Sequence, residues 1–300
     1  MVKKRNVKIH FDFYEINDAS SKESFKEVLD KLSTMRDNER NIEIFGEDIR
    51  IEAFSVDDGS NHYKASFVKL RPLEKISTYK LDGKGREIPL EDDEFVGEEV
   101  SFYYDPSLKV LVLQKNKYGV SAAGVEEYFQ KFLKNDHIKI LPMFTLDTYK
   151  KLLNQKEITY VETDVSIPSE KILEEEVEGW AFGDVRKLRE ELGAMKIGLT
   201  LTVEDSRKSK LDFNMATRLV KGLLKHTGTN RLKTKARKET GARLEEINLF
   251  EDLIRITYNR TLPVGSKFTI ETMQLLAEQA YVDKKGEVVE LLQSKRKREV

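Results

Sequence analysis

The sequence predicts an α+β protein of two lobes, each with a mixed, mainly antiparallel sheet and packed helices. Segments in which apolar and polar residues alternate indicate strands, apolar stripes at helical spacing indicate helices, and short turns between alternating segments indicate hairpins. The chain has 300 residues, which exceeds the usual size of a single domain. We therefore expect an N-terminal lobe over residues 1–153 and a C-terminal lobe over residues 154–300.

The first lobe is expected to begin with a strand, because residues 7–14 alternate between apolar and polar side chains. A helix should follow, since a serine can cap it and apolar residues recur at helical spacing from Phe25 to Leu32. Asp105 and Pro106 are typical of the turn in a hairpin. The other elements expected here are strands at 41–56, 62–72, 100–116 and 138–144, a polar loop at 81–99, and helices at 121–135 and 145–155.

The second lobe is expected to begin with an alternating strand at 158–168. An acidic run at 174–178 follows it, and the basic run at 294–298 near the C-terminus could act as a flexible contact. The other elements expected in this lobe are strands at 196–203, 231–238, 243–250 and 253–262, and helices at 179–195, 212–226 and 270–282.

The composition narrows the class of protein. Charged residues make up 35% of the chain, yet the net charge is only −1, so any basic site must be local. Cysteine is absent, which excludes disulfides, thiolate catalysis and cysteine-ligated metals and fits a reducing compartment. No apolar run approaches the length of a membrane span, and the first residues show no signal peptide. We therefore expect a cytoplasmic protein.

Motifs for catalysis are missing from the sequence. The four histidines stand far apart, and there is no GxxxxGK[ST] phosphate loop and no GxSxG nucleophile elbow. We therefore predict no catalytic residue, no cofactor and no metal site. A metal-dependent nuclease stays an alternative, because converging carboxylates could bind the metal. The carboxylates considered for it are Asp57, Asp58, Glu91, Asp92, Asp93, Glu174 and Glu176.

Positive charge is concentrated between residues 205 and 243. This segment holds twelve basic residues and three acidic ones, a net charge of +9 in a chain of net −1. Such a segment is typical of a surface that binds nucleic-acid phosphates, although in so charged a protein it could also be plain solvated surface. The predicted DNA-binding residues are Arg207, Lys208, Lys210, Arg218, Lys221, Lys225, Arg231, Lys233, Lys235, Arg237 and Lys238.

The expected elements would order these cations in two rows. On a strand at 231–238, alternate basic residues share one face at about 6.6 to 6.8 Å, close to the phosphate repeat of nucleic acid. On a helix at 212–226, Arg218, Lys221 and Lys225 share another face. The two rows could line one groove. Phe213 is the one aromatic residue in the basic segment, so backbone contacts to a duplex are favoured over base stacking.

Three stretches resemble the RexA-like phage-exclusion protein family. They are residues 91–133, with an acidic lead-in, a hairpin and a helix; residues 184–210, with a helix and a strand that ends in basic residues; and residues 231–250, a hairpin after another helix. The likeness covers roughly residues 42–281 in matching order. A looser similarity is to the DNA-binding subunit of the Kiwa antiphage system. The first 40 residues and the basic C-terminal tail have no counterpart in either.

The resemblance implies a non-enzymatic homodimer that binds duplex DNA with little sequence preference. It also implies a role in antiphage defence or phage exclusion, together with a membrane-embedded partner protein. Two alternatives stay open at this point. One is a protein-binding module, such as a phage-encoded inhibitor of host defence, and the other is the metal-dependent nuclease.

Overall fold

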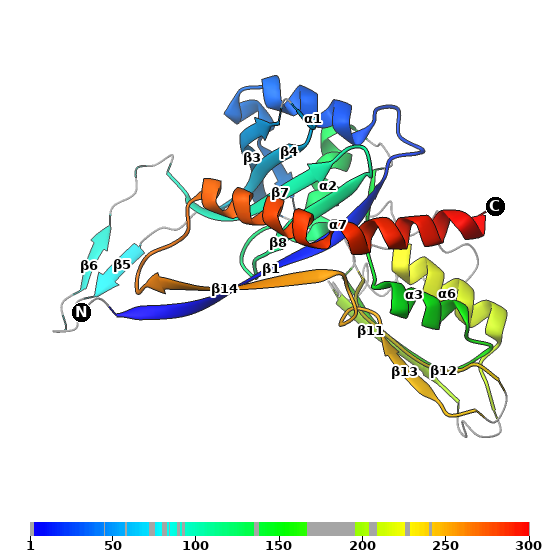
Figure 1. Cartoon of the computed structure of the whole chain (residues 1–300). Helices are drawn as coiled ribbons and strands as arrows, with labels where there is room; N and C mark the ends of the chain where they lie inside the picture. The colour runs from blue at the N-terminus through cyan, green and yellow to red at the C-terminus, as the bar shows by residue number, and fades with distance from the viewer. Residues whose placement is uncertain are drawn as a thin grey trace.

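The computed structural model describes residues 3–299 except for 45, 58, 72–75, 80–82, 84, 89–90, 92–93, 135–137, 167–195, 204–208, 226–228 and 240–241. It has the α+β fold that the sequence predicts, with helices packed on mainly antiparallel sheets (Figure 1). The predicted helix at 179–195 and the acidic run at 174–178 lie outside the described residues.

The larger sheet has eight strands, and each of its described pairings is antiparallel. Seven strands follow the order β14-β1-β8-β7-β4-β3-β2, and β9 pairs with the last residues of β1. Their bounds are β1 (Lys4–Asn17), β2 (Ile42–Ile44), β3 (Glu47–Val56), β4 (Tyr63–Arg71), β7 (Val96–Asp105), β8 (Val110–Lys115), β9 (Lys139–Pro142) and β14 (Arg255–Pro263). Strands from both ends of the chain therefore lie side by side at one edge of this sheet (Figure 1).

Helices cover the two faces of the larger sheet. On one face, α1 (Phe25–Thr34) and α2 (Ala122–Phe132) bury their apolar stripes in a core with β3, β4, β7 and β8. On the other face, α7 (Ile270–Glu299) packs against β4, β7 and β8, and Ile9, Phe11 and Phe13 of β1 belong to the same core. The sequence predicts that this last helix ends at 282. It continues because Val288, Leu291 and Leu292 are buried in the same core, so the basic run at 294–298 is helical.

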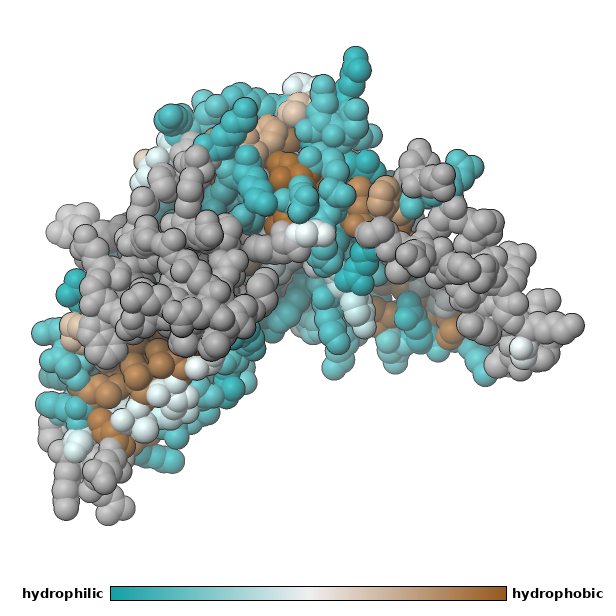
Figure 2. Space-filling view, turned by 180° about the vertical axis from the view of Figure 1, so that it is seen from behind, coloured by the Kyte–Doolittle hydropathy of each residue, from teal (hydrophilic) through white to brown (hydrophobic). Residues whose placement is uncertain are grey.

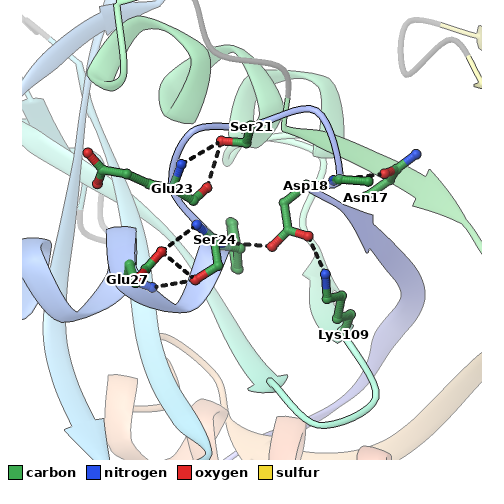
Figure 3. A network of polar contacts seen from close by, with 9 residues as sticks. Asn17, Asp18, Ser21, Glu23, Ser24, Glu27 and Lys109 are labelled. Atoms are coloured by element: carbon green, nitrogen blue, oxygen red, sulfur yellow. Dashed lines mark hydrogen bonds and ion pairs between the residues drawn. The ribbon is translucent and has the colours of Figure 1, made fainter.

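The start of α1 is tied to β1 and β8 by polar contacts (Figure 3). Ser24 caps the helix, and the Glu27 carboxylate accepts a hydrogen bond from the Ser24 amide at 2.7 Å, which completes a capping box. The buried Asp18 carboxylate accepts from the Phe25 amide at 2.9 Å and also pairs with Lys109. These contacts position the helix over the sheet from its first turn.

The smaller sheet has four strands in the order β11-β10-β12-β13. Their bounds are β10 (Glu157–Ser166), β11 (Lys196–Thr202), β12 (Thr229–Arg237) and β13 (Glu245–Asn248). One face of this sheet packs against α6 (Phe213–Lys225), which buries Ala216, Leu219 and Leu223 there. Ile197 and Leu201 are only partly buried in this core, and hydrophobic side chains stay in view on this part of the molecule at the lower left of Figure 2.

Shorter elements complete the described chain. They are the 3-10 turn η1 (Asp37–Arg40), α3 (Leu146–Leu153), and a separate hairpin of β5 (Ile76–Tyr79) and β6 (Gly85–Ile88). The segment 81–99 was expected to be a loop, but β6 and the start of β7 lie in it, because 76–79 supplies β6 with a partner strand. In the described part of the chain, no helix is both long and apolar enough to cross a membrane.

Strand pairing crosses the predicted boundary between residues 153 and 154. The smaller sheet starts with β10 just after that boundary, but β14 pairs with β1, and α7 packs on the larger sheet. Residues 255–299 therefore belong structurally with the first half of the chain, because β14 continues the larger sheet at its edge. A division of the chain into domains at 153 and 154 stays a prediction.

Candidate nucleic-acid interface

The predicted basic strand is β12, and its alternating residues point to opposite faces of the smaller sheet. Leu232, Thr234 and Ala236 are buried on the side of α6. Arg231 and Lys233 therefore point away from α6, as does Lys235. We call the surface they form with the acids of the neighbouring strands the small-sheet face. That these three cations share one face is as the sequence predicts.

Acids from the neighbouring strands neutralise the small-sheet face. The Arg231 guanidinium lies 3.0 Å from the Glu162 carboxylate of β10, and Lys233 lies 2.7 Å from Glu246 of β13. Lys235 is 3.7 Å from the same Glu246 carboxylate. A hydrogen bond from Lys233 holds the pKa of Glu246 below its usual value. The net charge of this face is therefore much smaller than the sequence segment suggests.

Three more predicted contacts form ion pairs near the end of β12. Arg237 is 7% exposed, and its guanidinium lies 2.8 Å from the buried Glu157 carboxylate. Lys210 lies 3.1 Å from the same carboxylate. The exposed Lys238 pairs with Glu245 at 3.5 Å. Arg237 is thus a buried structural residue, and DNA could reach it only if its ion pair with Glu157 broke.

The helical row of cations lies on the far side of the smaller sheet. Arg218 and Lys221 are exposed on α6, which covers the sheet face opposite to Arg231 and Lys233. The two rows therefore do not line one groove, because α6 packs on the sheet with its apolar face and so carries its cations outward. Lys225 is the last residue of α6, and its side chain is not described. Arg207 and Lys208 lie outside the described residues.

Of the carboxylates considered for a nuclease, only Asp57 and Glu91 are described. Asp57 accepts hydrogen bonds from the Gly59 amide and the Ser60 hydroxyl, so it stabilises a turn. Across the described ranges, no group of three or more histidine, aspartate or glutamate side chains is placed to hold a metal ion. The other five carboxylates lie outside the described residues.

A second basic surface lies where β1 pairs with β14. Residues 4–9 of β1 pair with β14 alone, because β8 joins β1 only from His10 onward. The first part of β1 and the last part of β14 therefore form a two-stranded ribbon, which extends to the left in Figure 1. We call its polar side, with the adjoining end of β8, the ribbon face. It consists of Lys4, Asn6, Lys8, His10, Asp12, Lys115, Arg255, Thr257, Asn259, Thr261 and Pro263.

Cross-strand contacts show that these side chains share one face. The Thr261 hydroxyl donates to the Asn6 side-chain oxygen at 3.0 Å, and His10 Nδ1 lies 2.8 Å from the Thr257 hydroxyl. At the inner end, the Arg255 guanidinium donates to the buried Asp12 carboxylate at 2.8 Å. A polar ladder therefore runs along the ribbon.

The ribbon face carries more cations than acids. Lys4, Lys8 and Lys115 are exposed, and none of them forms an ion pair within the described part of the chain. The one acid on this face is Asp12, which is already paired with Arg255. Burial lowers the pKa of His10, and the nearby charges of Arg255, Lys115 and Lys8 lower it further, while Asp12 raises it. The local potential is therefore positive.

The sequence contains only a partial signal for this surface. The alternation of residues 7–14 places lysine and histidine on one side of a predicted strand, and 253–262 reads as another strand. Nothing local indicates that these strands pair, because they are more than 240 residues apart. Only their pairing turns two ordinary polar strand faces into one basic surface.

Two comparisons with known proteins complete this description. The model of a family of unknown function (DUF6731) matches residues 2–286 of the chain. No curated protein matches the sequence.

Proposed function

The chain belongs to the DUF6731 family of unknown function, and we propose that it is a non-enzymatic cytoplasmic protein that binds duplex DNA through the ribbon face with little sequence preference. One observation carries the proposal. On the ribbon face, Lys4, Lys8 and Lys115 have no acidic partner in the described chain, whereas Arg231, Lys233 and Lys235 on the small-sheet face each have one. Unpaired cations can bind phosphate without first breaking an ion pair.

The shape of the ribbon supports duplex binding. The major groove of B-DNA admits a two-stranded antiparallel ribbon. Lys4 and Lys8 are four residues apart on one strand, which places them about 13 Å apart on the same face. Asn259 and Thr257 stand on the neighbouring strand and could donate hydrogen bonds to phosphate oxygens. These contacts position a protein on the DNA backbone but do not read base sequence.

The binding energy would come mainly from counterion release. Each phosphate that a lysine or arginine neutralises adds about −0.9 to the slope of log K against log salt. If Lys4, Lys8 and Lys115 each neutralise one phosphate, the slope is about −2.7. A slope of this size gives binding that is weak at high salt and similar for unrelated duplexes.

The test compares the two basic surfaces by matched substitutions. The ribbon variant combines Lys4→Gln, Lys8→Gln and Lys115→Gln, and the control combines Arg231→Gln, Lys233→Gln and Lys235→Gln. Both remove three positive charges. Affinity for two unrelated 20-base-pair duplexes is measured by fluorescence anisotropy between 50 and 200 mM salt.

We expect the ribbon variant to lose affinity on the order of 100-fold or more at 0.1 M salt, and its slope to flatten by about 2.7. The control should bind nearly as the wild type does. The reverse outcome would move the DNA site to the small-sheet face that the sequence predicts. An unchanged affinity in both variants would refute both surfaces. Cleavage of the duplex when Mg²⁺ is added would contradict a non-enzymatic protein.

The resemblance to RexA-like phage-exclusion proteins and to the Kiwa DNA-binding subunit supports a wider proposal. We propose that DNA binding serves antiphage defence or phage exclusion, and that the protein acts as a homodimer with a membrane-embedded partner protein. The test is the plating efficiency of phage on cells that carry the chain and its neighbouring genes. Wild type should reduce plating, and the ribbon variant should restore it. Equal plating with and without the intact chain would refute the role in defence.

A further inference from the structure

A pocket of about 340 Å³ lies at the inner end of the ribbon face, between the larger sheet and the turn that follows β13. We propose that it binds the phosphorylated end of a nucleotide-sized ligand, namely a nucleoside 5′-phosphate. A volume of this size lies within the range of small-molecule sites. This site goes beyond the proposed duplex binding and does not depend on it.

Three cations line the pocket. Lys115 and Lys117 come from the end of β8 and the turn after it, and Arg255 comes from β14, on the other side of β1. Both lysines are exposed and have no acidic partner in the described chain, while Asp12 is the one acid of the lining and is engaged by Arg255. The lining therefore has a net charge of +2, counted over its three cations and one carboxylate.

The first turn of α2 also lines the pocket. Ser121 accepts a hydrogen bond from the Gly124 amide at 3.2 Å and caps the helix, and Ala122 and Ala123 line the pocket. The amides at the start of a helix carry partial positive charge, which favours an anion at this position. The helix start supports the site, but the two unpaired lysines and the cavity are what define it.

Apolar side chains line the pocket as well. Pro142 comes from β9, which pairs with β1 as β8 does, and Phe250 and Leu253 come from the turn after β13. A flat ring could pack against these side chains while its phosphate reached Lys115 and Lys117. Inorganic phosphate would contact only the cations, and a nucleoside only the apolar side chains. The pocket therefore fits a ligand that combines both parts.

Ala123 offers a sharp test because it lies in the first turn of α2. Ala123→Glu places a carboxylate in the pocket, where it repels anions, while an acid at this position favours the helix. Ala123→Gln is the matched control, since it has the same size without the charge. Binding of adenosine 5′-monophosphate, adenosine and inorganic phosphate is measured by calorimetry, and melting is followed in parallel.

We expect wild type to bind adenosine 5′-monophosphate at least tenfold more tightly than either adenosine or phosphate. Ala123→Glu should lose at least tenfold in this affinity without a lower melting temperature, and Ala123→Gln should lose less than threefold. Equal affinity for adenosine and its monophosphate would overturn the proposal, as would binding that survives Ala123→Glu. Absence of binding by all three probes at millimolar concentration would overturn it too.

Two further experiments are needed. The first distinguishes a DNA end from a free nucleotide as the ligand, and the second tests nucleotide binding separately from duplex binding. A duplex with a 5′-phosphate that binds more tightly than its 5′-hydroxyl form would identify a DNA end as the source, and equal binding would identify the free nucleotide. Lys4→Gln with Lys8→Gln leaves the pocket lining intact. That variant should lose duplex affinity and keep nucleotide affinity. Retained nucleotide binding in a protein that binds no duplex would refute the proposed function alone.

Discussion

The small-sheet face and the ribbon face both carry rows of cations on an exposed strand, yet they differ in what surrounds those rows. On the small-sheet face, β10 and β13 place Glu162 and Glu246 beside the cations of β12. On the ribbon face, β14 places threonine and asparagine beside the lysines of β1. The charge of a strand face therefore depends on the residues across the ladder as much as on the strand itself.

This difference explains why a count along the chain is a poor guide to a phosphate site. The +9 segment has its neutralising acids outside its own limits, on strands that the fold brings beside it. The N-terminal strand has an ordinary count of cations, but its neighbours add no free acid. Three experiments test how far this comparison holds.

The largest effect is expected at Arg237. Its ion pair with Glu157 is buried, whereas the ion pairs of Arg231, Lys233 and Lys235 are partly exposed. Replacing Arg237 by methionine leaves the buried Glu157 carboxylate with only part of its neutralising charge. We expect a loss of about 3–5 kcal/mol in the free energy of unfolding, toward the lower value because Lys210 still contacts Glu157. Urea denaturation measures it.

The exposed Arg231→Met is the matched control and should lose far less. The double variant Glu157→Met, Arg237→Met should regain most of the lost stability, because it removes the buried charge together with its partner. If Arg237→Met instead left stability unchanged and lowered DNA affinity, Arg237 would be a DNA contact after all.

The second variant leaves the cations of the small-sheet face without their acidic partners. Glu162→Gln with Glu246→Gln removes the acids that pair with Arg231, Lys233 and Lys235. We expect duplex affinity to rise, on the order of tenfold at 0.1 M salt for each cation that becomes free to bind phosphate. Anisotropy titrations as a function of salt should also show a steeper slope.

The exposed Glu290 supplies the control for net charge, as Glu290→Gln changes the total charge on α7, a helix that packs on the larger sheet. It should leave affinity nearly unchanged. If the double variant gained nothing over it, charge compensation would not be what keeps DNA off the small-sheet face.

The sequence predicted those parts of the fold that depend on local pattern. The alternation in residues 7–14 and 231–238 marked strands, and the stripe from Phe25 to Leu32 marked a helix, because burial of one face imposes a period on the sequence. It also placed Arg231, Lys233 and Lys235 on one face.

The pairing of distant strands could not be predicted in this way. The pairing of β1 with β14 joins residues separated by almost the whole chain, and nothing in the sequence of either strand indicates which strand it pairs with. The pocket beside it depends on the same long-range contacts, because Asp12, Lys115 and Arg255 come from three separate parts of the sequence. The apolar stripe of α6 predicted which side of the helix is buried. It did not predict that α6 covers the sheet face opposite to Arg231, Lys233 and Lys235.

The smallest effect is expected at His10. The pKa of this side chain reports directly on the charges of the ribbon face. Its pKa lies below the ordinary value of 6.5 because of partial burial and the cations Arg255, Lys115 and Lys8, which outweigh Asp12. Between the folded pKa and 6.5, the unfolded chain binds more protons than the folded one, so this residue's contribution to stability is present above pH 6.5 and falls as the pH drops below it.

NMR titration of the His10 ring should therefore give a midpoint below 6.5, and Lys115→Met should move it upward because one repelling cation is removed. Duplex DNA should move it upward as well, since phosphates placed beside the ring favour its protonated form. DNA bound on the small-sheet face would leave the midpoint where it is, because that face lies on a different sheet. A His10 midpoint that ignored DNA, in a protein shown to bind it, would assign the contact to a surface other than the ribbon.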